Sequence, residues 1–239
     1  RRLDQANPQA GARRNVAHHY DLTPAIFDLF LDTDRQYSCA YFEREGVSLD
    51  EAQIAKKAHI ARKLLLSKGM RVLEIGCGWG GFAEYAARER GLRVTGLTIS
   101  QAQYDYAVAR MARAGLSERV TIKLQDYRDE TGLYDGVASI EMFEAVGEKY
   151  WPVYFNTLRE RLKPGRHATL QIITLQEKRF EVYRKGVDFI QKHIFPGGML
   201  PSPSVLRAEV AKAGLNVKGS VEFGKSYSDT LRRWHDTFN

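Results

Sequence analysis

The sequence predicts an α/β fold built on a doubly wound, mainly parallel sheet. Short apolar segments of strand length at 71–75, 93–98, 120–124 and 134–141 alternate with stretches of helical periodicity. That alternation is typical of parallel βαβ units. A second observation is the run of glycines at 76, 78, 80 and 81, directly after the first of these segments. Glycines permit a tight turn from strand to helix, and such folds bind ligands at this edge of the sheet.

Length, charge and cysteine content restrict the class of protein. The chain has 239 residues and 44% hydrophobic residues, enough for one α/β domain with additions. No run of about 18 apolar residues is present, and the first residues are polar and basic, so we expect no membrane span and no signal peptide. Cys39 and Cys77 form no Cys-x-x-Cys pair, which favours a reducing, cytoplasmic setting and no metal site.

The formal net charge of +7 favours an anionic partner. Nucleic acid and anionic phospholipid headgroups both fit, and charge alone does not choose between them.

The amino-terminal quarter is predicted to be an arm followed by helices. Residues 1–15 lack periodicity, and a short helix is expected from Pro24 to Leu31. A polar loop follows to Ala40. Ser48 and Glu51 form a capping box that predicts a helix through to Ser67. Its apolar face would comprise Ile54, Ala58, Ala61, Leu64 and Leu65.

Beyond the glycine turn, helices are predicted to about Arg90, over 100–114 and over about 150–162. Lys163-Pro-Gly165 stops the last of these, and a fifth strand is expected at 168–175. A helix at 204–213, a strand at 216–223 and a helix around Trp234 complete the pattern. Residues 176–203 are too long for a routine connection, and we expect them to cover a substrate site.

The glycine turn alone is compatible with two ligand classes. Gly76, Gly78 and Gly81 satisfy the Gly-x-Gly-x-x-Gly pattern of dinucleotide enzymes. With Glu74 two positions before the first glycine and with Gly80, the same stretch resembles the first motif of S-adenosylmethionine-dependent methyltransferases.

Polar residues follow the other predicted strands, and strand ends converge on one crevice in this topology. Thr98, Ser100 and Gln103 follow the second strand. Gln125-Asp126-Tyr127 follow the third and offer a carboxylate and an aromatic ring for an adenine. Glu141 and Glu144 follow the fourth; they share a face if this is a helical turn, and otherwise one of them is solvated.

Several motifs together are similar to those of the cyclopropane-fatty-acid synthases, which include the mycolic acid cyclopropane synthases. They run in order from about Arg14 to Trp234. They are His19-Tyr-Asp-Leu22, Gln36-Tyr-Ser-Cys-Ala-Tyr-Phe42, Gly69-Met70, Gly76-Cys-Gly-Trp-Gly-Gly81, Gly96-Leu-Thr-Ile-Ser-Gln101, Leu124-Gln-Asp-Tyr-Arg128, Met142-Phe-Glu144, Ile194-Phe-Pro-Gly-Gly198 and Leu200-Pro-Ser202.

The resemblance implies a Rossmann-like class I methyltransferase fold. Residues 1–67 would form an arm and helical segment that contributes to the active site. Residues 68–239 would form the S-adenosylmethionine-binding domain, with a lipid-binding insertion at about 176–203 and a truncated carboxyl terminus.

The implied reaction is methyl transfer from S-adenosylmethionine to the cis double bond of unsaturated acyl chains of phospholipids, giving cyclopropane fatty acids. A bicarbonate ion would act as base. The resemblance assigns its contacts to the backbones of Cys39 and Ile173 and to the side chains of Glu144, Gln171 and Tyr227; Tyr20 would lie near the positive charge. Cofactor contacts would be Tyr37, Ser38, Glu74, Gly76, Gly78, Thr98, Gln103, Gln125, Asp126 and Tyr127, and no metal is expected.

Two departures from the family pattern bear on the product. Gln171 stands where these synthases have histidine, and Glu-Ala-Val-Gly occupies 144–147 where many have Glu-His. Glutamine cannot shuttle a proton. A methyl-branched or methylene fatty acid is therefore an alternative product. A small amine is an alternative acceptor, because plant N-methyltransferases share the glycine and Tyr-Ser-Cys motifs.

The insertion favours a lipid partner over nucleic acid. It mixes apolar and aromatic residues with cations, as expected of an amphipathic cover that meets anionic headgroups. The apolar members are Phe180, Tyr183, Phe189, Ile190, Ile194 and Phe195, and the cations are Lys178, Arg179, Arg184, Lys185 and Lys192. The protein would then be peripheral to the inner face of the membrane. A basic lipid- or nucleic-acid-binding module with an inactive methyltransferase fold is the non-enzymatic alternative, and the sequence leaves a homodimer open.

Overall fold

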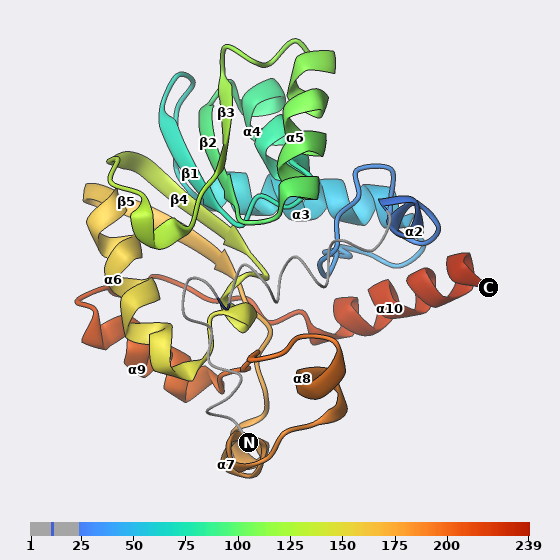
Figure 1. Ribbon diagram of the computed structural model, residues 1–239, viewed down its shortest axis with the longest axis vertical. Coiled ribbons are helices and arrows are strands. Elements are labelled where there is room, and N and C mark those ends of the chain that lie inside the picture. The colour runs from blue at the N-terminus through green and yellow to red at the C-terminus, as the bar shows by residue number, and fades with distance from the viewer. Residues whose placement is uncertain (1–10, 12–23) are drawn as a thin grey trace.

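The structure is a computed structural model that describes residue 11 and residues 24–239. A parallel sheet lies at its centre, in the strand order β3-β2-β1-β4-β5 (Figure 1). The strands are β1 (Arg71–Ile75), β2 (Arg93–Thr98), β3 (Val120–Leu124), β4 (Tyr134–Ile140) and β5 (Leu162–Gln171). All neighbouring pairs run parallel, and the order reverses between β1 and β4. The doubly wound parallel fold is therefore confirmed.

Different helices cover the two faces of the sheet. The first face is covered by α3 (Leu49–Lys63), α4 (Gly81–Arg90) and α5 (Gln101–Arg113), and the second by α6 (Trp151–Arg161) and α9 (Pro203–Lys212) (Figure 1). Successive strand residues point to opposite faces, so Val72 packs in the first core and Leu73 in the second.

The remaining helices lie around the carboxyl ends of the strands or beyond them. They are α2 (Pro24–Asp28), α7 (Glu177–Lys185), α8 (Phe189–His193), α10 (Gly224–Phe238) and the short 3₁₀ helices η2 (Tyr127–Asp129), η3 (Phe143–Ala145) and η4 (Glu148–Tyr150). The insertion folds into α7 and α8, which lie apart from the sheet at the lower end of Figure 1. Phe180 attaches α7 to the second core, whereas Val182 (77% exposed) and Ile190 (51% exposed) face outward.

Two strand predictions need correction. β5 begins at Leu162 rather than at residue 168, because the Pro164-Gly165 segment bulges from the ladder between the Tyr134–Leu162 and Gly136–His167 pairs; it also ends at Gln171 rather than at 175. Residues 216–223 form no strand. Val217 and Val221 both remain 50% exposed, so their alternation with polar residues buries no face against the sheet.

The helix predicted from Ser48 exists and its capping box is confirmed, but only part of its predicted apolar face is buried, at Ala61 and Leu64. It ends at Lys63, and Ile54 and Leu65 are exposed. The buried positions include Gln53, Lys56 and Lys57 instead. The loop at residues 34–38 accepts hydrogen bonds from the Gln53 side-chain amide N–H and from both lysine ammonium groups, so packing against a polar loop replaced part of the expected apolar contact.

No helix among residue 11 and residues 24–239 is long and apolar enough to cross a bilayer.

Candidate active site

The glycine turn after β1 is fixed to the neighbouring strand and open on one side. The N–H groups of Gly76 and Cys77 donate to the carbonyl oxygen of Leu97, at 3.1 and 2.8 Å. Gly76 has a φ of 79°, and a Cβ at this position would lie 2.6 Å from Cγ of Met142. At Gly78 (φ 52°) a Cβ would meet no atom within 4 Å. Gly76 is therefore required for packing, whereas Gly78 leaves its backbone accessible to a ligand.

Glu74 is a buried acceptor beside this turn. One of its carboxylate oxygens, Oε2, is buried and has no hydrogen-bond partner. Burial raises the pKa of Glu74 well above its usual value, against the opposing charges of Lys56 and Arg110. A ligand with an ammonium or N–H group would satisfy this oxygen.

The predicted cofactor residues after β2 and β3 lie at the same edge of the sheet. The N–H of Gln125 donates to the carbonyl oxygen of Thr98 at 2.9 Å, which joins the two strand ends. The hydroxyl of Thr98 donates to Oε1 of Gln103 at 2.8 Å. Asp126 forms an ion pair with Arg128 at 2.6 Å, and the ring of Tyr127 packs edge-on against Tyr154. The structure thus brings these residues together and holds each in an internal contact.

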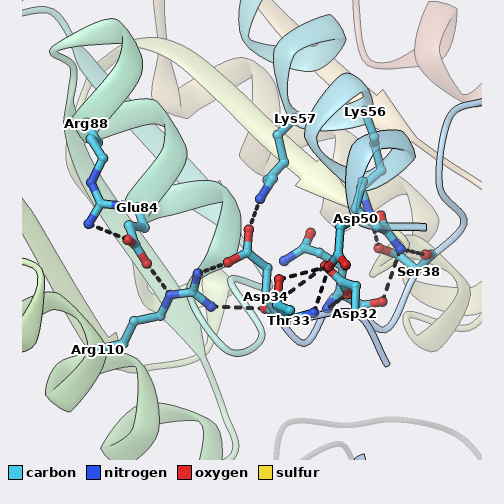
Figure 2. Close-up of polar contacts among 12 residues, drawn as sticks. Asp32, Thr33, Asp34, Ser38, Asp50, Lys56, Lys57, Glu84, Arg88 and Arg110 are labelled. Atoms are coloured by element: carbon cyan, nitrogen blue, oxygen red, sulfur yellow. Dashed lines mark hydrogen bonds and ion pairs between the residues drawn. The ribbon is translucent and has the colours of Figure 1, made fainter. Parts of the chain in front are cut away.

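A network of charges fixes the polar loop at residues 32–39 over the helices α3, α4 and α5 (Figure 2). Asp34 pairs with Lys57 of α3 and, at 2.5 Å, with Arg110 of α5. Arg110 also pairs with Glu84 of α4. The ammonium of Lys56 donates to the hydroxyl of Ser38 at 2.6 Å.

Tyr37 connects this loop to α10. Its ring stacks on Trp234, with 5.5 Å between ring centroids and an interplanar angle of 27°. Next to it, the N–H of Ala40 donates to the hydroxyl of Thr230 at 3.0 Å. The segment that carries Tyr37, Ser38 and Cys39 is consequently held on both sides.

A carboxylate lies between this loop and β5. Glu141 directly follows β4 and adopts a left-handed φ of 47°. Its Oε1 accepts hydrogen bonds from the Cys39 N–H at 2.9 Å and from Nε2 of Gln171 at 2.8 Å. The same Nε2 donates to the carbonyl oxygen of Cys39 at 3.0 Å. Two of the predicted site residues, Cys39 and Gln171, therefore meet around a third group.

Glu144, one helical turn further on, has a different environment. Its Oε1 accepts from the Ile173 N–H at 2.5 Å, whereas its buried Oε2 has no partner. Burial raises the pKa of both carboxyls. The charge of Glu141 raises that of Glu144 further, while the bonds from Gln171 and Cys39 and the charge of Lys56 favour ionised Glu141. In this pair Glu141 is the ionised member and Glu144 the protonated one.

Tyr227 and Cys39 are neutral in this environment. Burial and then the charge of Glu141 raise the pKa of Tyr227, with further contributions from Cys39 and Glu144. Burial and Glu141 raise the pKa of the Cys39 thiol to about 12. A thiol with so high a pKa is not a nucleophile at neutral pH. Tyr20, the remaining predicted catalytic residue, lies outside the residues that the structure describes.

The contacts predicted for bicarbonate are largely occupied by the chain itself. The Cys39 N–H and Gln171 Nε2 donate to Glu141, and the Ile173 N–H donates to Glu144. A further anion at these donors would face the Glu141 carboxylate at short range. The residues present do not fit bicarbonate in the predicted place.

The sequence reasoning missed two members of this site. Glu141 was noticed as a carboxylate at a strand end, but no role was assigned to it; the signal was its position directly after β4. Lys56 was missed because a helix face was expected to be apolar. Two adjacent lysines at 56 and 57, on the side of the helix that carries Ile60, were the available signal.

Comparison with known proteins identifies the family to which the chain is similar. A family model described as Mycolic acid cyclopropane synthetase matches residues 8–239. Tuberculostearic acid methyltransferase UfaA1 of Mycobacterium tuberculosis is 40% identical over 235 residues, which cover 95% of this chain and 55% of that protein. Cyclopropane-fatty-acyl-phospholipid synthase of Escherichia coli is 41% identical over 221 residues, covering 92% of this chain and 55% of that protein.

The fold is similar to a crystal structure of mycolic acid cyclopropane synthase CmaA1 complexed with SAH and CTAB. The TM-score is 0.87 at 32% identity, and the match covers 98% of this chain and 84% of that one. The chain spans about half the length of the two curated relatives above. It belongs to the mycolic acid cyclopropane synthetase family.

Proposed function

We propose that this chain carries the active site of an S-adenosylmethionine-dependent C-methyltransferase. Its acceptor would be the cis double bond of an unsaturated fatty acyl chain on a phospholipid. The observation that carries this proposal is the half-buried carboxylate pair of Glu141 and Glu144, at the same edge of the sheet as the open glycine turn. A methylated alkene becomes a product only when a proton is removed, and a carboxylate in a buried site suits that step.

The residues around the turn fit S-adenosylmethionine. The open backbone of Gly78 and the unpartnered Oε2 of Glu74 match a ligand with an ammonium group and a nucleoside. Thr98, Gln103, Gln125, Asp126 and Tyr127 would bind the nucleoside side, with Gly76, Tyr37 and Ser38 completing the site. When bound, S-adenosylmethionine supplies the methyl group that the alkene accepts. The name of the relative solved with SAH supports this assignment.

The chain's own residues would exclude water from the reacting carbons. An alkene is a weak nucleophile, and the cation that it forms would react with water, so positioning and a dry site are required. Loop 32–39 is fixed by ion pairs on one side, and α10 holds it on the other. Tyr37 and Tyr227 would present aromatic faces to the positive charge.

A phospholipid acceptor is supported by the surface of the insertion and by the name of the Escherichia coli relative. Val182 and Ile190 are exposed on α7 and α8, beside the exposed cations Lys178, Arg179 and Lys192. Apolar side chains next to cations suit a membrane surface with anionic headgroups. We therefore propose that α7 and α8 form the membrane-contacting surface and that the protein is peripheral to the membrane.

The test is incubation of the protein with S-adenosylmethionine carrying a labelled methyl group and vesicles of dioleoyl phosphatidylglycerol. We expect label in the acyl chain. Vesicles of dipalmitoyl phosphatidylglycerol, which have no double bond, are the matched control and should remain unlabelled. Label in neither lipid would refute the proposal, and label only in an added small amine would favour N-methylation instead.

Mass spectrometry of the released fatty acid before and after mild hydrogenation identifies the product. A cyclopropane ring survives mild hydrogenation, whereas a methylene group is converted to a methyl branch. Both products require loss of one proton and no reductant. A saturated methyl branch formed directly would require an added reductant, which makes it distinguishable by its dependence on one.

A further inference from the structure

We propose that the carboxylate of Glu141 is the resident base of this reaction, in the place that bicarbonate would take. This inference rests on the proposed function and names the group that accepts the proton. It follows because the donors that would bind an added anion already bind a carboxylate of the chain itself.

The donors around Glu141 form a built anion site. A backbone N–H from the loop of Cys39 and a side-chain amide from the end of β5 converge on one oxygen, Oε1, at 2.9 and 2.8 Å. The Gln171 amide is itself oriented by the carbonyl oxygen of Cys39 at 3.0 Å. The second oxygen, Oε2, has no part in these bonds and is the one that can accept a proton. The side chain thus supplies the two features required of a bicarbonate base, a fixed oxygen and a reactive one.

The backbone at Glu141 supports a functional reason for this residue. Its φ of 47° lies in the left-handed region, which disfavours any side chain and suits glycine. Glu141 therefore adopts a backbone conformation that costs free energy for a residue with a side chain. Backbone strain of this kind concentrates at functional sites. The turn directs the side chain back across the ends of β4 and β5 toward the Cys39 loop.

The charges around the pair distinguish the roles of its two members. Lys56, buried beneath the loop, favours the ionised form of Glu141, and so do the bonds from Cys39 and Gln171. Burial and the charge of Glu141 keep Glu144 protonated, and its single donor, the Ile173 N–H, does not offset them. Tyr227 and Cys39 also face the pair and remain neutral. Among the carboxyls of this cluster, Glu141 is therefore the one able to receive a proton.

The proton transfer is balanced without a further reactant. After the double bond has accepted the methyl group, the acyl chain carries a carbocation. A C–H bond of the added methyl breaks, and the proton moves to Oε2 of Glu141. The electron pair of that bond forms either the closing C–C bond of a ring or the C=C bond of a methylene group. The protonated Glu141 then returns its proton to solvent.

The experiment compares the full chain with two variants in carbonate-free and bicarbonate-containing buffers, with labelled S-adenosylmethionine and dioleoyl phosphatidylglycerol vesicles. The wild type should keep its turnover within about twofold when bicarbonate is removed. Glu141→Gly removes the carboxylate and suits the left-handed backbone, so the variant should fold. Its turnover should fall by about 100-fold or more, the usual contribution of a general base, and rise at least tenfold with added bicarbonate.

Glu141→Gln is the control that keeps the shape of the side chain. Its amide oxygen still accepts from Cys39 and Gln171, but it cannot take a proton and it leaves no room for another anion. Turnover should fall as far as in Glu141→Gly and should not recover with bicarbonate. Both variants should keep the wild-type dissociation constant for S-adenosylhomocysteine in calorimetry and a cooperative thermal transition.

Binding of ¹³C-labelled bicarbonate, followed by NMR line broadening, gives a readout that does not depend on turnover. Broadening with Glu141→Gly and none with the wild type or Glu141→Gln would support the inference. Equal broadening with the wild type would overturn it, and so would a wild type that requires bicarbonate or a Glu141→Gln variant that remains active. If the wild type methylates no lipid in either buffer, the proposed function fails, and the binding comparison separately decides whether Glu141 fills the anion site.

Discussion

Gly76 combines a left-handed backbone with a close side-chain contact, so the glycine turn tolerates little change at this position. A methyl group there would lie 2.6 Å from Cγ and 2.9 Å from Cβ of Met142, in addition to the left-handed backbone. We expect Gly76→Ala to lower the free energy of unfolding by about 2–4 kcal/mol, the sum of a conformational cost and an overpacking cost. Urea unfolding monitored by circular dichroism measures this change.

Two other glycines separate these costs. Gly115→Ala tests the conformational cost alone, because its φ is 66° and no atom lies within 4 Å of the added Cβ; about 1–2 kcal/mol is expected. Gly78→Ala should cost a similar amount of stability but also weaken binding of S-adenosylhomocysteine, since the added methyl occupies the open face of the turn. Equal losses of stability in Gly76→Ala and Gly115→Ala would contradict the packing argument.

Glu144 makes stability depend on pH in a direction opposite to that of a salt-bridged carboxylate. Its folded-state pKa is raised above the usual 4.5, so the folded protein holds the proton more tightly than the unfolded chain does. The contribution is fully present below about pH 4.5 and is lost as pH rises toward the folded pKa. Glu144→Gln, which is neutral throughout, should therefore be more stable than the wild type at pH 7.5 by about 1–3 kcal/mol and differ less at pH 5.

The measurement for Glu144 is urea unfolding at pH 5.0, 6.0 and 7.5. The exposed Glu222, replaced by Gln, serves as the control and should follow the wild-type curve. Lys56, with a pKa lowered to about 8 by burial, adds pH dependence only above this range. A constant difference between Glu144→Gln and the wild type across the range would show that the two states bind this proton equally.

At the residue scale, patterns predicted the glycine turn after β1 but not the proposed role of Glu141. Glu74 and the glycines carry a local signature that depends on the backbone, so the sequence could identify them. The role of Glu141 depends on donors at Cys39 and Gln171, which are distant in the chain. Glu141 and Glu144 stood out as a pair, yet only the fold distinguishes the one with two donors from the one with a single donor.

At the scale of elements, the loop at residues 32–39 depends on Asp34. Asp34→Asn leaves the buried ammonium of Lys57 without its counter-charge and weakens the contact with Arg110. We expect a loss of about 1–3 kcal/mol in the free energy of unfolding, because a buried charged partner becomes poorly satisfied. Hydrogen exchange should accelerate most at the amides of residues 36–39, and binding of S-adenosylhomocysteine should weaken as this segment loosens.

The ion pair of Glu45 with Lys225 provides the matched control for Asp34. Both of its side chains are highly exposed, so Glu45→Gln should change stability by less than about 0.5 kcal/mol and leave exchange in the loop unchanged. If Asp34→Asn also behaved in this way, the network in Figure 2 would not position the loop.

The predicted boundaries that depend on a strong local sequence signal agree with the structure. Those that depend on pairing with a distant strand do not. The capping box of Ser48 and Glu51 correctly started α3, and Lys163-Pro-Gly165 correctly ended α6. The same Pro-Gly pair concealed the start of β5, because a bulge allows the strand to continue around it. Residues 216–223 alternate apolar and polar side chains as a strand would, but they pair with no strand of the sheet. The alternation in the sequence does not show whether a neighbouring strand is available for pairing.

At the scale of the whole molecule, the composition favours a partner of negative charge. The exposed side chains of the insertion are the basis for the proposed place of binding. The net charge of +7 fitted nucleic acid and phospholipid equally. The insertion adds apolar side chains that project away from the two cores, on α7, which Phe180 attaches to the second core, and on α8. A nucleic-acid surface has no need of exposed aliphatic side chains, whereas a membrane surface buries them.

The proposed membrane contact through α7 and α8 leads to a prediction for the protein. The double variant Val182→Ser, Ile190→Ser removes two exposed aliphatic side chains without touching either core. Because each side chain contributes up to about 1.5–3 kcal/mol when it is fully buried, binding to vesicles of dioleoyl phosphatidylglycerol should weaken at least about tenfold. Cosedimentation at 0.1 M salt measures the partition, and binding should fall further at 0.5 M salt as the cations of the insertion are screened.

Leu133→Ser is the matched control for this surface. Leu133 is also about half exposed, but it precedes β4 and therefore lies at the opposite edge of the sheet from the site. Its replacement should leave vesicle binding unchanged, and all variants should keep their affinity for S-adenosylhomocysteine, since none contacts the glycine turn. Equal binding by the double variant and the wild type would place the membrane contact elsewhere on the molecule. Equal loss in the double variant and Leu133→Ser would instead indicate a general effect of apolar surface, because Leu133 is as exposed as Ile190 but lies away from the insertion.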